Sequence, residues 1–371
     1  MKKILKLKPG DRVAIVSPSF AASAVWPHVH ELGLKRIREV FGLEPVMFPA
    51  TANPDATLEE KANDLVAAFS DPDIKAVIST LGGDIQVTYI KNLPSEPFLN
   101  NPKPFFGFSD NSHFANFLFL NGIPSFYGAA LFTQFAHQKE MNPYTVEYIK
   151  HALFDEGEFE LLPSKSFNDL GLDWGYESQL DKEREYETNE GWSWAGNNNC
   201  EGLLWGGCVE SVDEMLRHGV EIPSLEQFEN IVLMMETSEE IPTADYVSRV
   251  FRAFGERGIL ERIKGIVVGR AKAREFDKLR NLDERAVYRK EQQETIVKTV
   301  RAYNKDIPIV QNMDFGHTVK WGQGHYFWKM CGLISSRPLS TSDSVAKIML
   351  PYHLLHPYIF PKRSAFIHGV P

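Results

Sequence analysis

Short apolar runs alternate with longer stretches of mixed polarity through the first half of the chain. The runs are RVAIVSPS, EPVMF, KAVIST, PFFGFS and PSFYG. Runs of this length suit buried strands, and the stretches between them are long enough to hold helices. The alternation predicts a parallel sheet covered by helices, which is the pattern of an α/β domain.

Local capping signals mark several helix boundaries. Thr57 and Glu60 form a capping box that opens a helix running to about Phe69. A helix predicted over 111–121 ends before Gly122, because glycine readily adopts the left-handed conformation of a C-cap. In the second half, helices are predicted over 209–218, 243–256 and about 284–303.

The composition changes near residue 164 and divides the chain. Residues 164–200 are polar and acidic, with several aromatic but few aliphatic side chains, and apolar runs then resume at EGLLWGG, ENIVLMME, KGIVVGR and IPIVQNMDFGH. We expect an N-terminal α/β domain over 1–163, an aromatic-rich connector over 164–200, a C-terminal α/β domain over 201–345 and a tail over 346–371.

Composition narrows the functional classes. The chain has 371 residues and a formal net charge of -9, so it lacks the basic balance that nucleic acid or an anionic membrane surface requires. Its three cysteines form no C-x-x-C pair, which argues against a disulfide framework and against a zinc site. No apolar stretch is long enough to cross a membrane, so we expect a cytoplasmic protein. We also expect neither a metal nor another cofactor.

Polar residues follow four of the predicted strands, where ligands gather in open α/β sheets. These are Gly82-Gly83-Asp84, Ser109-Asp110, Glu236-Thr237 and His317. Each also has an ordinary explanation. Ser109 could cap a helix, Glu236 could face solvent, His317 could sit in a turn, and the glycine pair could be a tight turn.

Taken together, the serine, glutamate and histidine suggest nucleophilic catalysis. A serine hydroxyl needs an imidazole to accept its proton, and the imidazole needs a carboxylate to fix its tautomer. Asn111 stands where the second glycine of a G-x-S-x-G motif would be, which argues against an ordinary α/β-hydrolase.

Seven ordered motifs resemble the LD-carboxypeptidase family of serine peptidases, which includes the microcin C immunity proteins. They are LKPGDRVAIVSPS, STLGGD, FFGFSDNS with SFYGAAL, LLWGGCVESV, IVLMMETSE, GIVVGR and NMDFGHT. The resemblance implies a flavodoxin-like N-terminal domain, a swivelling C-terminal domain with a mixed sheet, an active site in the groove between them, and a homodimer.

The resemblance also implies roles for individual residues. Ser109 would be the nucleophile, His317 the general base and Glu236 the carboxylate that orients it. The backbone N–H groups of Gly83 and Asp110 would form the oxyanion hole.

The substrate is expected to be a small molecule. Chain length and the aromatic connector favour the immunity-type class, with a murein peptide as the alternative. Immunity-type members cleave an aminoacyl-nucleotide and stack its base on aromatic rings, and Trp192 and Trp194 are candidates for this stacking. Gly82 is a further candidate for substrate binding. The same rings could instead pin the connector onto the domains. Members of the other branch trim a murein tetrapeptide and need a cation for its free carboxylate. Arg270 could meet such an anionic group, or it could equally form a salt bridge between the two domains. A non-catalytic two-lobed binding protein is the third hypothesis.

Overall fold

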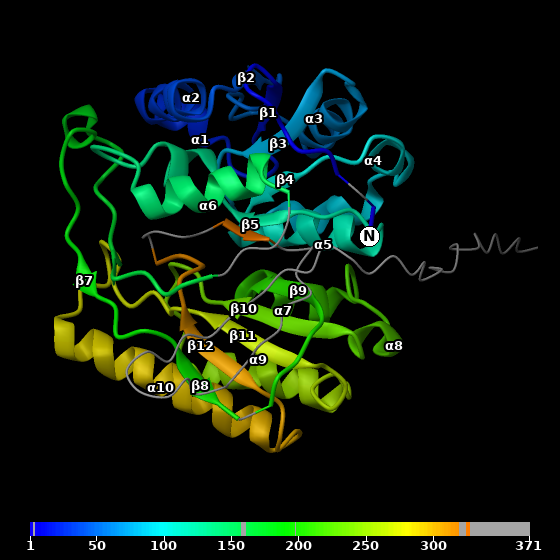
Figure 1. Cartoon of the computed structure of the whole chain (residues 1–371), viewed down its shortest axis with the longest axis vertical. Helices are drawn as coiled ribbons and strands as arrows, with labels where there is room; N and C mark the ends of the chain where they lie inside the picture. The colour runs from blue at the N-terminus through cyan, green and yellow to red at the C-terminus, as the bar shows by residue number, and fades with distance from the viewer. Residues whose placement is uncertain (3, 157–160, 197, 319–323, 327–371) are drawn as a thin grey trace, which may run out of the picture.

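Two α/β units lie one above the other in this computed structural model, which describes residues 1–2, 4–156, 161–196, 198–318 and 324–326 (Figure 1). The expected tail over 346–371 lies outside the described residues. Among those described, no helix is both long and apolar enough to cross a bilayer.

The N-terminal unit is built on a six-stranded sheet in the order β13-β5-β4-β3-β1-β2. Five strands are parallel in the order 2-1-3-4-5, as in flavodoxin-like folds. They are β1 (Arg12–Val16), β2 (Glu44–Met47), β3 (Ile74–Ser79), β4 (Phe105–Gly107) and β5 (Phe126–Gly128). The expected parallel sheet is therefore confirmed.

The sixth strand comes from the far end of the described chain. β13 (Gly324–Tyr326) pairs antiparallel with β5, although its residues fall within the range expected for the C-terminal domain. Its position at a sheet edge depends on backbone pairing with a distant strand, which no local sequence pattern encodes.

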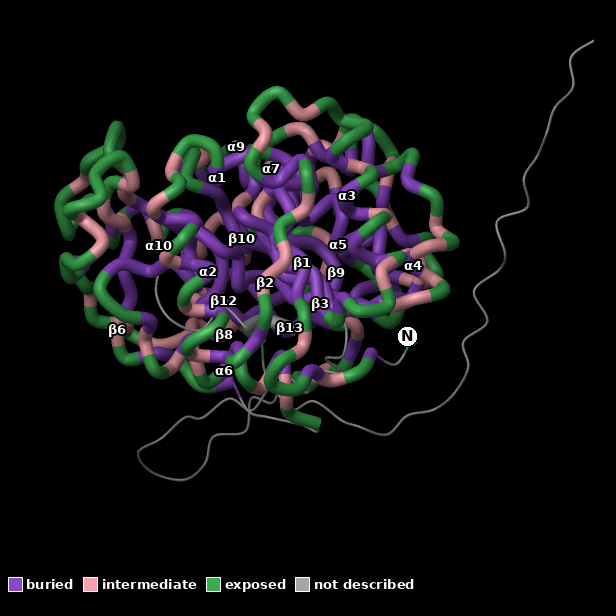
Figure 2. Tube along the Cα trace, turned by 90° about the horizontal axis from the view of Figure 1, so that it is seen from above, coloured by how far each residue is buried: buried purple, intermediate pink, exposed green. Residues whose placement is uncertain are grey.

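Alternate residues of each central strand point to opposite faces of the sheet. In β1, Val13 and Ile15 pack into one hydrophobic cluster and Ala14 and Val16 into another. Both faces are thus buried, which explains why the strand is a continuous apolar run. The buried segments lie at the centre of the molecule and the exposed ones at its periphery (Figure 2).

Helices surround this sheet. They are α1 (Ala22–Val25), α2 (Pro27–Phe41), α3 (Leu58–Ser70), α4 (Glu96–Asn100), α5 (Ser112–Leu120) and α6 (Pro143–Phe154), with a π-helical turn at Leu131–Phe135. The predicted capping box at Thr57 is present, because its hydroxyl accepts from the Glu60 N–H and the Glu60 carboxylate accepts from the Thr57 N–H.

The C-terminal unit contains a five-stranded mixed sheet in the order β8-β12-β11-β10-β9. The strands β9 (Leu203–Cys208), β10 (Ile231–Glu236), β11 (Gly265–Gly269) and β12 (Ile309–Met313) are parallel, and β8 (Ser193–Ala195) is antiparallel at the edge. Its helices are α7 (Val209–His218), α8 (Leu225–Phe228), α9 (Ala244–Glu256) and α10 (Leu282–Arg301). The α/β class and the mixed second sheet are confirmed.

The connector is more structured than its composition suggests. It contains a two-stranded antiparallel sheet of β6 (Ser166–Phe167) and β7 (Glu187–Thr188), and a 3-10 turn at Glu177–Gln179 lies in the segment between these strands. It ends with β8. Because β8 pairs with β12, the end of the connector belongs to the C-terminal sheet.

The two units meet along α5, which packs against β9 and α7. Asn116 on α5 donates to the Gly206 carbonyl at 2.8 Å, and the Cys208 N–H donates to Ser112 Oγ at 3.1 Å. A Cβ on Gly207 would overlap the Ser112 side chain, so glycine is required there for the close approach of the two units. This contact brings the ends of β4, β9 and β10 close together.

Candidate active site

Ser109 lies on a sharp turn directly after β4. Its φ of 64° places a non-glycine residue in the left-handed region, and the chain then enters a 3-10 turn over Ser109–Asn111 followed by α5. Gly107 is needed two residues earlier, since a Cβ there would lie 2.7 Å from Ser79 Oγ. A strained strand-to-helix turn of this kind displays a side chain at the end of a sheet.

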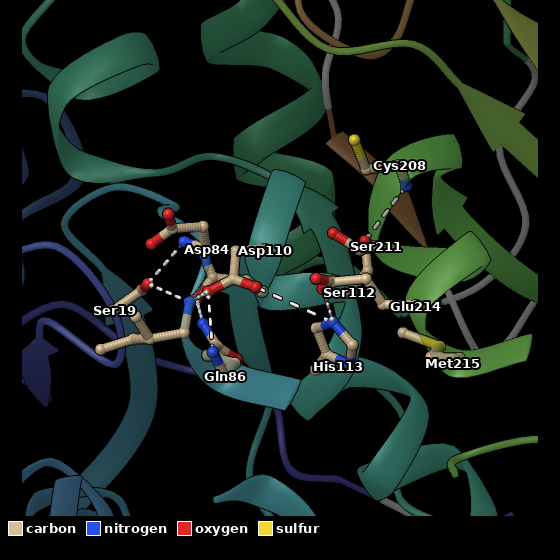
Figure 3. A network of polar contacts seen from close by, with 12 residues as sticks. Ser19, Asp84, Gln86, Asp110, Ser112, His113, Cys208, Ser211, Glu214 and Met215 are labelled. Carbon is tan, nitrogen blue, oxygen red and sulfur yellow. Dashed lines mark hydrogen bonds and ion pairs between the residues drawn. The ribbon is translucent and has the colours of Figure 1, made fainter. Parts of the chain in front are cut away.

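Asp110 is buried and holds this turn to the loop after β3, which contains Gly82 and Gly83. Its carboxylate accepts from the N–H groups of Ile85 at 3.2 Å and Gln86 at 3.1 Å, while Ser19 accepts from the N–H of Asp84 (Figure 3). Burial raises the pKa of Asp110, even though the nearby His113 acts to lower it.

Asn111, which stands where a G-x-S-x-G motif would have its second glycine, has a structural role of its own. Its side chain donates to the carbonyls of Leu81 at 3.1 Å and Phe108 at 3.0 Å, and it accepts from Gln86 Nε2 at 2.9 Å. The amide thus ties the serine turn to the loop after β3 through three hydrogen bonds, a role that glycine could not perform.

The expected glycine pair lies against the serine. A Cβ on Gly82 would lie 2.7 Å from Ser109 Cβ and 2.9 Å from Ser109 Oγ, so the loop passes directly beside the hydroxyl. Gly83 has a φ of 151°, and a Cβ on it would overlap Ser19 Oγ. The predicted oxyanion-hole residues Gly83 and Asp110 therefore belong to segments that both border Ser109.

Glu236 and His317 form a hydrogen-bonded pair. Glu236 Oε2 accepts from the His317 backbone N–H at 3.1 Å and lies 2.9 Å from His317 Nδ1. Glu236 ends β10 and is fully buried, and His317 follows β12 after Gly316, whose φ is 99°. A Cβ on Gly316 would overlap the Glu236 carboxylate, so this glycine permits the contact.

Tyr127 links the serine turn to this pair. Its hydroxyl donates to Glu236 Oε1 and lies 3.4 Å from the Ser109 N–H, which donates to it. Burial and the adjacent carboxylate raise the pKa of Tyr127 well above its ordinary value, so the phenol keeps its proton. A residue of the N-terminal sheet thereby reaches the carboxylate of the C-terminal unit.

The remaining imidazole nitrogen faces a second carboxylate. His317 Nε2 lies 3.1 Å from Glu239 Oε2 in an ion pair, and among the described residues it makes no hydrogen bond to Ser109. The ring centroids of Phe108 and His317 are 5.0 Å apart, so the residue before Ser109 packs against the imidazole. Burial acts to lower the pKa of His317, but Glu236 and Glu239 outweigh it and raise that pKa to about 9.

The aromatic candidates of the connector lie against the C-terminal unit. Trp192 Nε1 donates to Asp314 at 3.0 Å, and Trp194 lies within β8 beside Val310 of β12. Trp174 packs instead on Trp26 of the N-terminal unit, with ring centroids 5.2 Å apart. These contacts agree with the alternative that the rings pin the connector onto the two units, and base stacking by Trp192 and Trp194 stays a prediction.

Arg270 is buried in a salt bridge. Its guanidinium lies 2.9 Å from Asp314 Oδ1, donates to Asn312 and stacks on Phe167 at 4.2 Å, with only 1% of its side chain exposed. The salt bridge lies within the C-terminal unit and is not the interdomain one expected from sequence, because Arg270 and Asp314 follow the neighbouring strands β11 and β12 of one sheet. The contact of Arg270 with a substrate stays a prediction.

Two residues of the site were not singled out from sequence. Tyr127 ends the apolar run PSFYG, so the rule that polar groups gather at strand ends could have identified it. Glu239 had only its acidic neighbourhood as a signal, because its contact with His317 joins residues far apart in the chain.

Two groups of side chains in the described part of the chain are close enough to bind a metal ion. They are Cys208 with Glu236 and His317, and Asp110 with His113 and Glu214. In the first group the imidazole is hydrogen-bonded to Glu236, and burial raises the pKa of the Cys208 thiol well above its ordinary value, which disfavours the thiolate that a metal needs.

Comparison with known proteins identifies related chains. Residues 13–128 match the model of the LD-carboxypeptidase N-terminal domain, and residues 201–321 match that of the C-terminal domain. A carboxypeptidase-named protein of Treponema pallidum is 28% identical over 86% of this chain and 88% of its own. The microcin C7 self-immunity protein MccF of Escherichia coli is 22% identical over 84% of this chain and 87% of its own.

Solved structures share the fold. An MccF-like protein from Bacillus anthracis covers 94% of this chain and 99% of its own with a TM-score of 0.78 at 24% identity. An MccF-like protein from Streptococcus pneumoniae, solved in complex with AMP, covers 84% of this chain and 93% of its own with a TM-score of 0.72 at 25% identity. With both domain models matched in order, this chain belongs to the LD-carboxypeptidase family of peptidases, family S66, and is a hydrolase of that family.

Proposed function

We propose that this protein is a serine hydrolase that cleaves an amide bond through an acyl-enzyme, with Ser109 as nucleophile, His317 as general base and Glu236 as its orienting carboxylate. The observation that carries the proposal is the double contact of Glu236 with the backbone and Nδ1 of His317, beside a serine at a φ of 64°. That contact holds a proton on Nδ1, so that Nε2, once it has lost its own proton and its contact with Glu239, can accept the proton of the serine hydroxyl.

The reaction would proceed in two steps. Ser109 Oγ forms a bond to the carbonyl carbon while its proton moves to His317 Nε2, and the N–H groups of Gly83 and Asp110 stabilise the oxyanion. The C–N bond then breaks as the same proton passes to the leaving nitrogen. Water activated by His317 releases the acyl group.

One rearrangement is required before this step. In the structure Nε2 faces Glu239, so the Glu239 carboxylate must move or find another partner for Ser109 to engage the imidazole. Catalytic hydrogen bonds often form only once substrate is bound, and this arrangement is compatible with that behaviour.

The proposed substrate is an aminoacyl-nucleotide. Support comes from the similarity to the microcin self-immunity protein and to an MccF-like protein that binds AMP. The second candidate is a murein tetrapeptide, favoured by the carboxypeptidase-named relative. Its terminal carboxylate needs a cation, whereas Arg270 is occupied by Asp314. We retain a cytoplasmic homodimer as a prediction for either substrate.

A covalent probe tests the nucleophile. A fluorophosphonate should label the wild-type protein and not the Ser109→Ala variant, with Ser112→Ala as a control that removes a neighbouring hydroxyl. Labelling of Ser109→Ala at the wild-type level would refute the proposed nucleophile.

Product masses then separate the substrates. The protein is incubated with alanyl-sulfamoyl adenosine and, separately, with a murein tetrapeptide. Release of alanine supports the proposal, and shortening of the tetrapeptide alone would replace it with the second candidate.

A further inference from the structure

We propose that Glu239 binds the free α-ammonium group of the substrate's acyl part, and that it thereby selects aminoacyl compounds with an unblocked amine. This inference rests on the proposed function and adds the feature of the substrate that the site recognises.

The position of Glu239 suits this role. Its Oε2 lies 3.1 Å from His317 Nε2, the nitrogen that in the proposed mechanism takes the Ser109 proton as Oγ attacks the carbonyl carbon. The α-nitrogen of an aminoacyl group is only two bonds from that carbonyl carbon, so it falls within reach of a carboxylate beside Nε2. The Glu239 side chain is 55% exposed and open to a ligand, whereas the Glu236 side chain is fully buried.

The loop that carries Glu239 is anchored on both sides. The Ser238 hydroxyl donates to Glu210 Oε1 at 2.7 Å, the Glu240 N–H donates to Ser238 Oγ at 3.1 Å, and Lys278 Nζ donates to the Glu240 carbonyl at 2.6 Å. The backbone around Glu239 is therefore held in place while its side chain reaches the imidazole. A fixed backbone with an exposed carboxylate is the arrangement expected of a recognition group.

The charges around His317 favour a cationic ligand. The carboxylates of Glu236 and Glu239 act on the imidazole directly, and that of Glu210 lies close to Glu236. Two lysines act on this pair, since Lys272 acts on both His317 and Glu239 and Lys278 acts on Glu239. Lys272 is paired with Glu275 at 2.5 Å, and Lys278 Nζ donates to the Glu240 carbonyl at 2.6 Å. Both ammonium groups already have a partner, so the carboxylates around His317 favour a ligand that brings positive charge over one that brings a carboxylate.

Binding of the ammonium group would also prepare the base. Burial acts to raise the pKa of Glu239, but the charge of His317, a backbone hydrogen bond and the charges of Lys272 and Lys278 together lower that pKa. Glu239 and His317 therefore favour each other's charged forms. An ammonium group on Glu239 competes with the imidazolium for the carboxylate, which lowers the pKa of His317 and frees Nε2 for Ser109. Substrate recognition and activation of the base would then be one event.

The test compares Glu239→Gln with Glu240→Gln, a matched control one residue away with an exposed side chain that has no contact with His317. Each protein is assayed with alanyl-sulfamoyl adenosine and with its N-acetylalanyl counterpart. Wild type and Glu240→Gln should prefer the free amine. In Glu239→Gln the kcat/KM for the free amine should fall about 10- to 100-fold, while that for the acetylated compound, compared on the high-pH plateau where His317 is neutral, stays within about threefold.

A pH profile and a labelling control complete the test. With one carboxylate removed, the rise of kcat/KM with pH for the acetylated compound should occur at lower pH in Glu239→Gln than in wild type. Equal cleavage of both compounds by wild type, or an unchanged preference in Glu239→Gln, would overturn the inference. So would loss of fluorophosphonate labelling in Glu239→Gln, because Glu239 would then act on the triad itself. In the first two cases, retained labelling of Ser109 leaves the proposed function intact.

Discussion

At the scale of single residues, the site depends on side chains held in unfavourable surroundings. A left-handed φ at Ser109 costs on the order of 1–3 kcal/mol, and the hydrogen bonds of Asp110 and Asn111 to the neighbouring loops offset it. Glu236 is a fully buried carboxylate and is stabilised by donors on both oxygens, from His317 on one and Tyr127 on the other.

Tyr127→Phe tests the contribution of the phenol. It leaves Glu236 Oε1 without a donor, and a hydrogen bond to a charged group contributes about 1.5–3 kcal/mol. We expect kcat to fall about 10- to 100-fold with little change in KM, measured with alanyl-sulfamoyl adenosine. Tyr148→Phe is the control, because its hydroxyl bonds the Leu162 N–H outside the triad. An unchanged kcat in Tyr127→Phe would show that Tyr127 is not part of the machinery.

At the scale of elements, Asp314 joins the connector to the end of β12. This buried carboxylate lies 2.9 Å from the Arg270 guanidinium, and it accepts from the Ser164 N–H at 3.0 Å and Trp192 Nε1 at 3.0 Å. His317 follows three residues later, so the connector and the loop that carries His317 share one anchor. The connector therefore helps to place the imidazole.

Arg270→Met tests this structural role against a substrate contact. Removing one partner of a buried ion pair destabilises a protein by about 3–5 kcal/mol, because the other charge is left buried and unpaired. We expect a loss of this size in the unfolding free energy by urea denaturation, with KM unchanged below the transition. Arg249→Met, which breaks an exposed pair with Asp245, should cost less than about 1 kcal/mol. A raised KM at unchanged stability would instead restore the predicted substrate contact.

At the scale of the whole molecule, His113 joins the two units. It is fully buried on α5 and lies 3.2 Å from Glu214 and 3.6 Å from Glu221 of the C-terminal unit. Burial acts to lower the pKa of His113, but Glu214, Glu221 and Asp110 raise it to about 9. We attribute the charge mainly to Glu214 and Glu221, because burial raises the pKa of Asp110 itself.

The raised pKa of His113 predicts how the unfolding free energy depends on pH. A histidine whose folded pKa is raised stabilises the protein fully below its unfolded pKa of about 6.5, and the contribution is lost as pH rises through about 9. The shift corresponds to about 3 kcal/mol. Between pH 6.5 and 9.5 the unfolding free energy of the wild type should therefore fall by about 3 kcal/mol more than that of His113→Gln. His218→Gln, which removes an exposed imidazole, should follow the wild type. Equal slopes for wild type and His113→Gln would refute the stabilising contact of a charged His113 with Glu214 and Glu221.

Much of the fold follows from local sequence patterns. The run RVAIV is apolar at every position after Arg12 because both faces of β1 are covered, and the cap at Thr57 needs only the Glu60 three residues away. The predicted helix over 209–218 is observed with those bounds as α7. Glu236 and His317 could be proposed as partners because polar groups that end parallel strands meet at one edge of a sheet.

Other features depended on residues that are distant in the chain. The strands, the capped helices and the shortlist of polar groups could be predicted from sequence, because propensity, capping and alternation act over a few residues. The folded chain was needed to show that Tyr127 reaches Glu236, that Glu239 faces His317, that Arg270 is paired with Asp314, and that β13 returns to the N-terminal sheet. Such contacts are set by how the two sheets pack, and this packing is a property of the whole chain.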